Sequence, residues 1–211
     1  MRASTAKELP GRCKQCWLRV DFCICVCIPK VATATEIIFV RHVREAQKST
    51  GTARIASFAL PNSRVVDFSD DASLPNEELA AMSEGYVLFP AEPHADWPAA
   101  PVSRLIVLDG TWRQTRKMFK KLPAIHGWPR LALPGIPEPK LRLRDTSFES
   151  GRSTLEATAD ALKLLEGDAI SNPLHALHDE YIERVFKARG VWEQKQQLFE
   201  AKQPRSRFEE P

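Results

Sequence analysis

The sequence lacks several patterns that define common classes of protein. No apolar run approaches the roughly 20 residues of a membrane-spanning helix, so we expect no membrane protein. Residues 1–8 lack the apolar core of a signal peptide, and we therefore expect a cytoplasmic location. There is no G-x-G-x-x-G fingerprint, no P-loop and no internal repeat. The net charge of +3 is too small to identify a partner by itself.

The length, composition and periodicity of the sequence predict one α/β domain. A chain of 211 residues with 43% hydrophobic and 27% charged residues supports a single sizeable core. Strand patterns at residues 36–40, 65–68, 86–89, 105–109 and 130–133 alternate with helical patterns at 44–60, 75–83, 112–122, 153–166 and 172–190. This alternation predicts a single, mostly parallel sheet flanked by helices. We expect three parts: a cysteine-rich segment at 1–30, the α/β domain at 31–190 and a loosely held, polar basic tail at 191–211.

All five cysteines lie close together near the start of the chain. Cys13-x-x-Cys16 and Cys23-x-Cys25 gather four thiols around a short turn, and Cys27 leaves the fourth ligand ambiguous. In a reducing compartment such a cluster favours metal over disulfides, and zinc prefers four tetrahedral thiolates. The alternative is a group of inert, partly buried cysteines.

An aspartate follows the most apolar strand. Residues 105–108 are apolar, and Asp109-Gly110 ends the strand at the edge where open α/β sheets bind ligands. The helix that follows has a cationic face formed by Arg113, Arg116, Lys117, Lys120 and Lys121. This face is either a phosphate-binding surface or a solvated helix surface. Asp-Gly alone is also a common turn.

Three further stretches allow two interpretations each. Lys140, Arg142 and Arg144 alternate along a predicted exposed strand at 140–145, either as protective charges or as phosphate contacts. Ser153 and Glu156 form an S-x-x-E capping box, so Glu156 either has this purely structural role or contributes to a site. The hydroxyl-rich turn around residue 51 either caps a helix or binds an anion.

Several motifs resemble those of one family. Asp109-Gly110-Thr111-Trp112 after an apolar strand is similar to the Asp-x-Thr-Trp signature of the DTW-domain family, whose members resemble tRNA-uridine aminocarboxypropyltransferases. Further matches are the cysteine cluster, the positions His42, Glu45 and Thr52, and the sequence Ser153-Thr154-x-Glu156-Ala157. Together they cover about residues 12–165.

The resemblance implies a SPOUT-like fold with a C-terminal trefoil knot formed by residues 109–112, 133–137 and 144–154. It also implies transfer of the 3-amino-3-carboxypropyl group of S-adenosylmethionine to N3 of a uridine in tRNA. A glycine fingerprint is not expected in such a fold. The resemblance assigns structural zinc to Cys13, Cys16, Cys23 and Cys25.

The resemblance and the cationic faces together give the candidate site residues. The catalytic candidates are Asp109, Thr111 and Trp112. The candidates for binding S-adenosylmethionine are Thr52, Leu108, Asp109, Gly110, Trp112, Leu133, Pro134, Gly135, Ser153, Thr154, Glu156 and Ala157. The candidates for binding tRNA are His42, Arg113, Arg116, Lys117, Lys120, Arg142 and Arg144.

Some of these roles stay open at the level of sequence. Asp109 is a general base or a holder of the ribose or amino group of the cofactor. Trp112 contacts the cofactor or is an ordinary core aromatic, and His42 alone is typical of a structural histidine. The alternative functions are a SPOUT-type RNA methyltransferase and a non-catalytic, zinc-stabilised RNA-binding module. No obligate protein partner is indicated.

Overall fold

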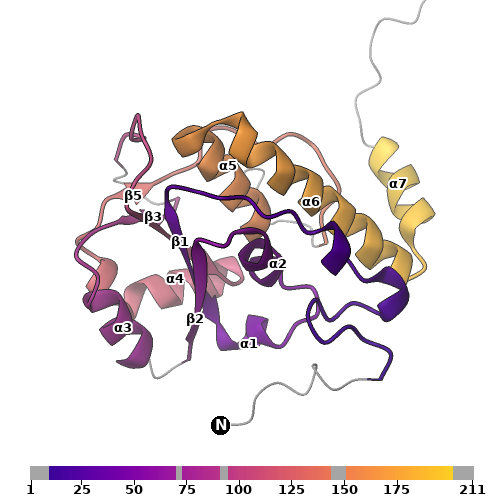
Figure 1. Cartoon of the computed structure of the whole chain (residues 1–211), viewed down its shortest axis with the longest axis horizontal. Coiled ribbons are helices and arrows are strands. Elements are labelled where there is room, and N and C mark those ends of the chain that lie inside the picture. Colours follow the sequence, from indigo (N-terminus) through magenta and orange to yellow (C-terminus); the bar gives the residue numbers. More distant parts are fainter. Residues whose placement is uncertain (1–9, 70–72, 91–94, 144–150, 202–211) are drawn as a thin grey trace, which may run out of the picture.

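The computed structural model describes residues 10–69, 73–90, 95–143 and 151–201 of the chain. Its centre is a five-stranded, fully parallel sheet with strand order β2-β1-β4-β3-β5 (Figure 1). The strands are β1 (Glu36–His42), β2 (Ser63–Phe68), β3 (Tyr86–Leu88), β4 (Arg104–Asp109) and β5 (Arg130–Leu131). The helices are α1 (Val43–Ala46), α2 (Thr52–Ala59), α3 (Ser73–Ala80), α4 (Trp112–Lys120), α5 (Thr154–Glu166), α6 (Asp168–Ala188) and α7 (Trp192–Glu200). No helix within the described ranges combines the length and apolarity needed to cross a bilayer. The parallel α/β prediction is confirmed.

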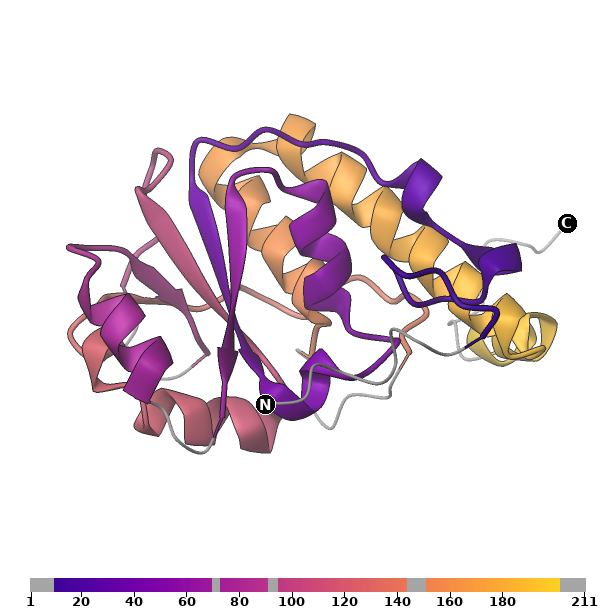
Figure 2. The same ribbon diagram turned by 60° about the horizontal axis from the view of Figure 1, so that its bottom comes forward.

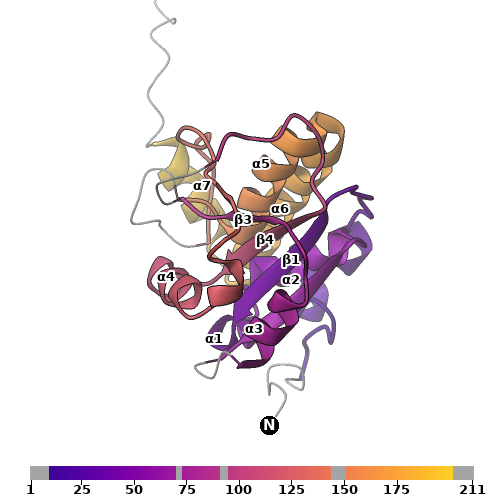
Figure 3. The same cartoon turned by 90° about the vertical axis from the view of Figure 1, so that its left-hand side faces the viewer.

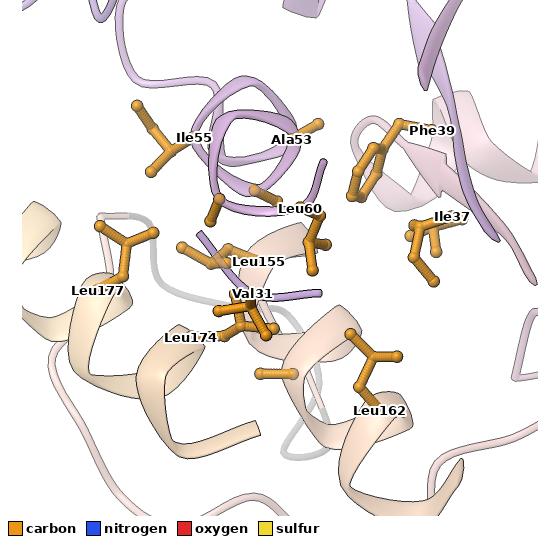
Figure 4. Packing of buried hydrophobic residues seen from close by; sticks show 14 of the residues in the cluster. Val31, Ile37, Phe39, Ala53, Ile55, Leu60, Leu155, Leu162, Leu174 and Leu177 are labelled. Atoms are coloured by element: carbon orange, nitrogen blue, oxygen red, sulfur yellow. The ribbon is translucent and has the colours of Figure 1, made fainter. Parts of the chain in front are cut away.

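Helices cover both faces of the sheet (Figure 2). Because side chains alternate along a strand, Ile37 and Phe39 of β1 enter one core, whereas Ile38 and Val40 enter the other. The larger core lies under α2, α5 and α6, where Leu155 and Leu174 gather beside the β1 side chains (Figure 4). The smaller core lies under α3 and α4. Burial on both faces explains why the central strands are continuous apolar runs.

The strand order creates a switch point at the carboxyl ends of β1 and β4. From β1 the chain passes to β2 on one side, whereas from β4 it passes beyond β3 to β5 on the other side. The helices that follow these strands begin at the same end of the sheet (Figure 3). Ligands of open α/β sheets bind in the crevice at such a point.

The cysteine-rich segment packs against the larger core. Cys16, Leu18 and Ile24 are buried in that core, and the segment runs beside the C-terminal half of α6 (Figure 2). Arg184 of α6 donates from Nη1 to the carbonyl oxygen of Cys23 at 2.5 Å. The segment is therefore fixed to the α/β domain by apolar packing and by hydrogen bonding.

Several element boundaries differ from expectation, and three of these differences have a clear physical reason. Residues 140–143, predicted to begin an exposed strand, form none, because Arg142 turns inward to a buried carboxylate. The strand predicted at 130–133 ends at Leu131, shortly before Pro134, which has no N–H to extend a ladder. Helix α6 begins at Asp168 rather than 172, because Gly167 (φ +90°) ends α5 and directly precedes α6.

The predicted loose tail begins instead with a helix. In α7, Lys195 lies over the ring of Phe186 of α6, with Nζ 5.9 Å from the ring centroid. Residues 202–211 of the predicted tail lie outside the described part of the chain. Residues 144–150, part of one of the three segments expected to form a knot, also lie outside it, and the knot stays a prediction.

Candidate active site

A cavity of about 680 Å³ opens at the carboxyl ends of β3, β4 and β5. Its size falls in the range of small-molecule sites. The lining residues come from segments far apart in sequence: Glu45, Thr50, Gly51, Thr52, Leu88, Phe89, Pro90, Val107, Leu108, Asp109, Gly110, Thr111, Trp112, Thr115, Leu131, Leu133, Arg142, Leu143, Gly151, Arg152, Ser153, Thr154, Ala157 and Ile182. The sheet edge thus brings together the 45–52 turn, the Asp109–Trp112 motif and the start of α5.

Most of the predicted cofactor-binding residues line this cavity. The exceptions are Pro134, Gly135 and Glu156. Sequence reasoning missed Phe89 and Pro90, which follow β3, and Ile182 of α6. Phe89 and Pro90 had a partial signal in the sequence: they end a predicted strand, and the carboxyl ends of parallel strands lie at the same edge of a sheet. Ile182 carried no signal beyond helical periodicity.

Asp109 is buried in the cavity wall at the end of β4. Its side chain is 5% exposed, and Oδ1 accepts a hydrogen bond from the Thr154 hydroxyl at 2.5 Å. This bond joins two motifs separated by 45 positions, the end of β4 and the first turn of α5. Asp109 is therefore an oriented carboxylate facing a cavity, which an ordinary surface turn would not provide.

Gly110 and Thr111 make the sharp passage from β4 into α4. Thr111 is the N-cap of α4: its Oγ1 accepts from Gln114 N, and its own N–H donates to Gln114 Oε1 at 2.6 Å. A Cβ at position 110 would lie 3.0 Å from Cβ of Gln114. Glycine therefore fits the close passage between the end of β4 and the N-cap of α4.

Trp112 lies at the cavity wall rather than in the apolar core. It is 37% exposed, and its ring stacks on Phe89 with centroids 5.6 Å apart. Phe89 in turn stacks on Phe119, with centroids 4.7 Å apart. The alternative of an ordinary core aromatic is therefore wrong, because this stack holds the indole at the rim.

Glu156 and Arg142 form an ion pair with each other. Glu156 is fully buried, and Arg142 donates to it from Nε at 2.9 Å and from Nη2 at 2.6 Å. Glu156 also completes the capping box with Ser153. The pair fastens the segment around residue 142 to α5. These contacts support structural roles for both residues, and the predicted cofactor contact of Glu156 and RNA contact of Arg142 stay predictions that the ion pair does not support.

The turn before α2 faces the cavity with Thr50, Gly51 and Thr52. The N-cap of α2 is Gly51 rather than Thr50 or Thr52, and glycine has no side chain with which to cap the helix. Glu45, also in the wall, is buried and pairs with Lys48 at 2.5 Å. The turn thus presents hydroxyls and a carboxylate to a ligand.

His42 has a structural position. Its ring is buried, and Nδ1 accepts from the backbone N–H of Arg44 at 3.1 Å, which caps α1. The ring also lies against Phe68, with centroids 6.0 Å apart. Contact with RNA therefore stays a prediction for His42 that this position does not support.

The cationic face of α4 adjoins the cavity. Arg113, Arg116, Lys117, Lys120 and Lys121 are exposed, whereas Trp112 and Thr115 of the same helix line the cavity. A polyanion lying on this face would therefore reach the cavity rim. Arg144, the remaining cation predicted to bind RNA, lies outside the described residues.

Four thiols could hold a metal ion. The Sγ atoms of Cys13, Cys16, Cys23 and Cys25 all lie within 4.8 Å of one another. The distances are 3.6 Å from Cys13 to Cys25 and 3.7 Å from Cys16 to Cys23. Tetrahedral zinc with bonds of about 2.3 Å requires sulfurs about 3.8 Å apart, so the cluster fits this ion. Cys27 is exposed, lies outside the cluster and contacts Nη2 of Arg184 at 3.3 Å.

The thiols differ in their ionisation. Burial raises the pKa of Cys16 and of Cys25. Burial also acts to raise the pKa of Cys13, but backbone hydrogen bonds from Cys16 and Gln15 outweigh it and lower that pKa to about 6. One thiolate is therefore available near neutral pH to start metal binding, because thiolates rather than thiols are metal ligands.

A ligand cavity at the carboxyl edge of a parallel sheet places the chain among α/β proteins that bind small molecules at a switch point. Comparison with known families is more specific. The DTW domain matches residues 11–186, so the chain belongs to the DTW domain family. The prediction of this family is confirmed.

Two curated relatives extend the comparison. The chain is 25% identical over 186 residues to tRNA-uridine aminocarboxypropyltransferase 2 of Drosophila melanogaster, covering 79% of this chain and 73% of the relative. It is also 25% identical over 191 residues to the protein of the same name from Macaca fascicularis, covering 82% of this chain and 63% of the relative. No solved structure matches the chain.

Proposed function

We propose that this protein transfers the 3-amino-3-carboxypropyl group of S-adenosylmethionine to N3 of a uridine in tRNA. Family membership and the names of the two relatives support this reaction. The observation that carries the proposal is the position of Asp109, buried in the wall of a cavity beside a cationic helix.

The cavity residues fit S-adenosylmethionine chemically. Asp109 and Glu45 place two carboxylates in the wall, which complements a ligand bearing sulfonium and ammonium charges. Ser153 and Thr154 lie at the N-terminus of α5, where the helix dipole favours a ligand carboxylate. Trp112, whose ring is held in place by stacking on Phe89, offers aromatic surface for an adenine ring.

S-adenosylmethionine, when bound, supplies the transferred group: its sulfur–γ-carbon bond breaks, the electron pair remains on sulfur in methylthioadenosine, and the γ-carbon bonds to uridine N3. The protein must orient the reactants and accept the N3 proton. We assign the proton to Asp109, because the Thr154 hydroxyl orients its carboxylate.

The cationic face of α4 supplies binding energy for tRNA. Phosphate contacts of this kind position the nucleic acid without reading its sequence. Because Trp112 and Thr115 of the same helix line the cavity, a strand held on α4 would present a base to the cavity mouth. We also propose that Cys13, Cys16, Cys23 and Cys25 bind a structural zinc ion, which ties the N-terminal segment to the core.

One experiment tests the reaction. Unmodified tRNA and the purified protein are incubated with S-adenosylmethionine labelled either in the methyl group or in the carboxypropyl carbons. We expect only the carboxypropyl label to enter RNA, and nuclease digestion to release one modified uridine. Entry of the methyl label would instead identify a SPOUT-type methyltransferase. Entry of neither label, with tRNA still bound, would identify a non-catalytic RNA-binding module. Heat-inactivated protein is the control.

A further inference from the structure

The turn that joins α1 to α2 lies in the cavity wall, and two buried side chains donate hydrogen bonds to its backbone. Tyr181 of α6 donates its hydroxyl hydrogen to the carbonyl oxygen of Ser49 at 2.9 Å. Arg54 of α2 donates from Nη2 to the carbonyl oxygens of Ala46 at 2.9 Å and Lys48 at 3.0 Å. These contacts set the path of a turn whose next residues line the cavity.

Arg54 is an unusual cation because it is buried without an acidic partner. Its side chain is 6% exposed, and no carboxylate among the described residues pairs with it. Its Nη1 has no hydrogen-bond partner within the described part of the chain. Burial lowers the pKa of Arg54 to about 10. Because burying a charge costs free energy, the position of this cation depends strongly on its remaining contacts.

One of these remaining contacts is the ring of Trp17. The guanidinium carbon of Arg54 lies 3.2 Å from the centroid of this ring, a close cation–π stack. Trp17 follows Cys16 directly and has a φ of +66°, which is rare for a residue with a bulky side chain. Its backbone N–H donates to the carbonyl oxygen of Cys13 at 2.9 Å. The turn between the first two cysteines thus determines where the indole lies.

We propose that Arg54 is a positioning residue that couples the cysteine cluster to the ligand cavity. An ordered cluster keeps Trp17 over the guanidinium, and the guanidinium keeps the turn at residues 46–51 in its ligand-binding path. When the cluster loses its metal, Trp17 leaves this position and the turn opens. The coupling rests on the proposed zinc ion and on the proposed cofactor site, but it makes no use of the transfer reaction.

Hydrogen exchange of the full-length protein tests the coupling directly. Removal of zinc with a chelator is expected to speed amide exchange in residues 11–27 and also in residues 46–52. In Arg54→Gln, residues 46–52 should exchange at least tenfold faster with zinc still bound, while residues 11–27 stay protected. Trp17→Leu should speed exchange in residues 46–52 whether or not the protein contains zinc.

Arg19→Gln is the matched control. Arg19 also lies over an aromatic ring in the cysteine segment, with its guanidinium carbon 5.6 Å from the centroid of the Phe22 ring, but it is exposed. This variant should leave residues 46–52 unchanged. The proposal is overturned if chelation or Trp17→Leu affects only residues 11–27, or if Arg54→Gln leaves the turn protected.

Calorimetric titration with S-adenosylmethionine gives a second readout. Arg54→Gln should weaken binding about tenfold and raise KM, while kcat at saturation stays within about twofold, and Arg54→Lys should recover part of the affinity. An unchanged affinity in Arg54→Gln would contradict the coupling. If the wild type bound no S-adenosylmethionine, the proposed function would fail, and the exchange rates would still decide the coupling.

Discussion

At the scale of single residues, the site depends on which groups donate hydrogen bonds to two carboxylates. Asp109 accepts from a hydroxyl and faces the cavity, whereas Glu156 accepts from a guanidinium and is fully buried. In the sequence the two residues look alike, because each is an acidic residue at the boundary of a helix or strand. Their surroundings support a chemical role for Asp109 and a structural one for Glu156.

Asp109→Asn should abolish most of the transfer without unfolding the protein. The amide keeps the shape but cannot accept a proton, so kcat should fall by about 10²–10⁴. The measurement is the rate of carboxypropyl incorporation at saturating tRNA and cofactor. Thr154→Val, which removes the orienting hydroxyl, should lower kcat less. If Asp109→Asn raised KM for S-adenosylmethionine and left kcat unchanged, Asp109 would hold the ligand and would not act as the base.

Arg142→Gln should destabilise the fold by about 3–5 kcal/mol, because it leaves the buried charge of Glu156 without its partner. Urea unfolding followed by circular dichroism measures this loss. The matched control is the double variant Arg142→Met with Glu156→Gln, which removes both charges and should recover much of the stability. Equal stability of Arg142→Gln and the wild type would show that the pair contributes nothing.

At the scale of elements, α4 combines two functions on two faces. Its buried residues Thr115 and Met118 pack against the sheet, and its outer residues are cations. Helical periodicity separates these faces, so charge can change on one face without affecting the other. The same separation makes the helix suitable for a direct test of RNA contact.

The triple variant Arg113→Gln, Arg116→Gln and Lys120→Gln should weaken tRNA binding and reduce its salt dependence. Each lost phosphate contact should lower the slope of log K against log salt by roughly 0.7–0.9. Filter binding across a salt series measures this slope. Cofactor binding should be unaffected, since Trp112 stays on Phe89. An unchanged slope would place the tRNA on another surface.

The contact between α5 and α6 depends on pH through Asp160. Burial acts to raise the pKa of this carboxyl, but hydrogen bonds from His175 and Arg152 outweigh it and hold the pKa below 3.8. Because the folded-state pKa is depressed, the stabilisation is present above pH 3.8 and is lost as the pH falls through the folded value.

Asp160→Asn should therefore cost about 1.5–3 kcal/mol at neutral pH, the usual contribution of hydrogen bonds to a charged group. The difference from the wild type should vanish in strong acid. Urea unfolding at a series of pH values tests both statements. A difference that persisted below the folded pKa would show that shape rather than charge stabilises this contact.

At the scale of the whole molecule, the cysteine segment is part of the core. Cys16, Leu18 and Ile24 pack with side chains from β1, α2, α5 and α6. A metal that orders this segment should therefore stabilise the entire domain, since metal binding and folding of a local site are one equilibrium.

Cys16→Ser should abolish zinc binding and lower the Tm by roughly 5–10 °C, equivalent to a loss of a few kcal/mol in a domain of this size. Cys27→Ser is the control: it lies outside the cluster, so metal content and Tm should stay unchanged. Elemental analysis and calorimetry measure the two quantities. Equal zinc content in Cys16→Ser and the wild type would remove Cys16 from the ligand set.

The local patterns were enough to predict several features. Apolar runs placed the five strands, the S-x-x-E motif placed the start of α5, and cysteine spacing identified the cluster that the structure brings together. These features depend on interactions between residues near one another in sequence, which periodicity and capping preferences report.

Other features depend on contacts between distant segments. The sequence by itself determined the parallel α/β class, the Asp109–Trp112 turn and the four-thiol cluster, because each arises from local spacing and burial preference. Only the tertiary structure decided that β4 lies between β1 and β3, that Arg142 pairs with Glu156, and that Trp17 covers Arg54. The physical reason is that buried charges are satisfied by whichever groups the packed strands and helices bring within reach, and no local pattern specifies those partners.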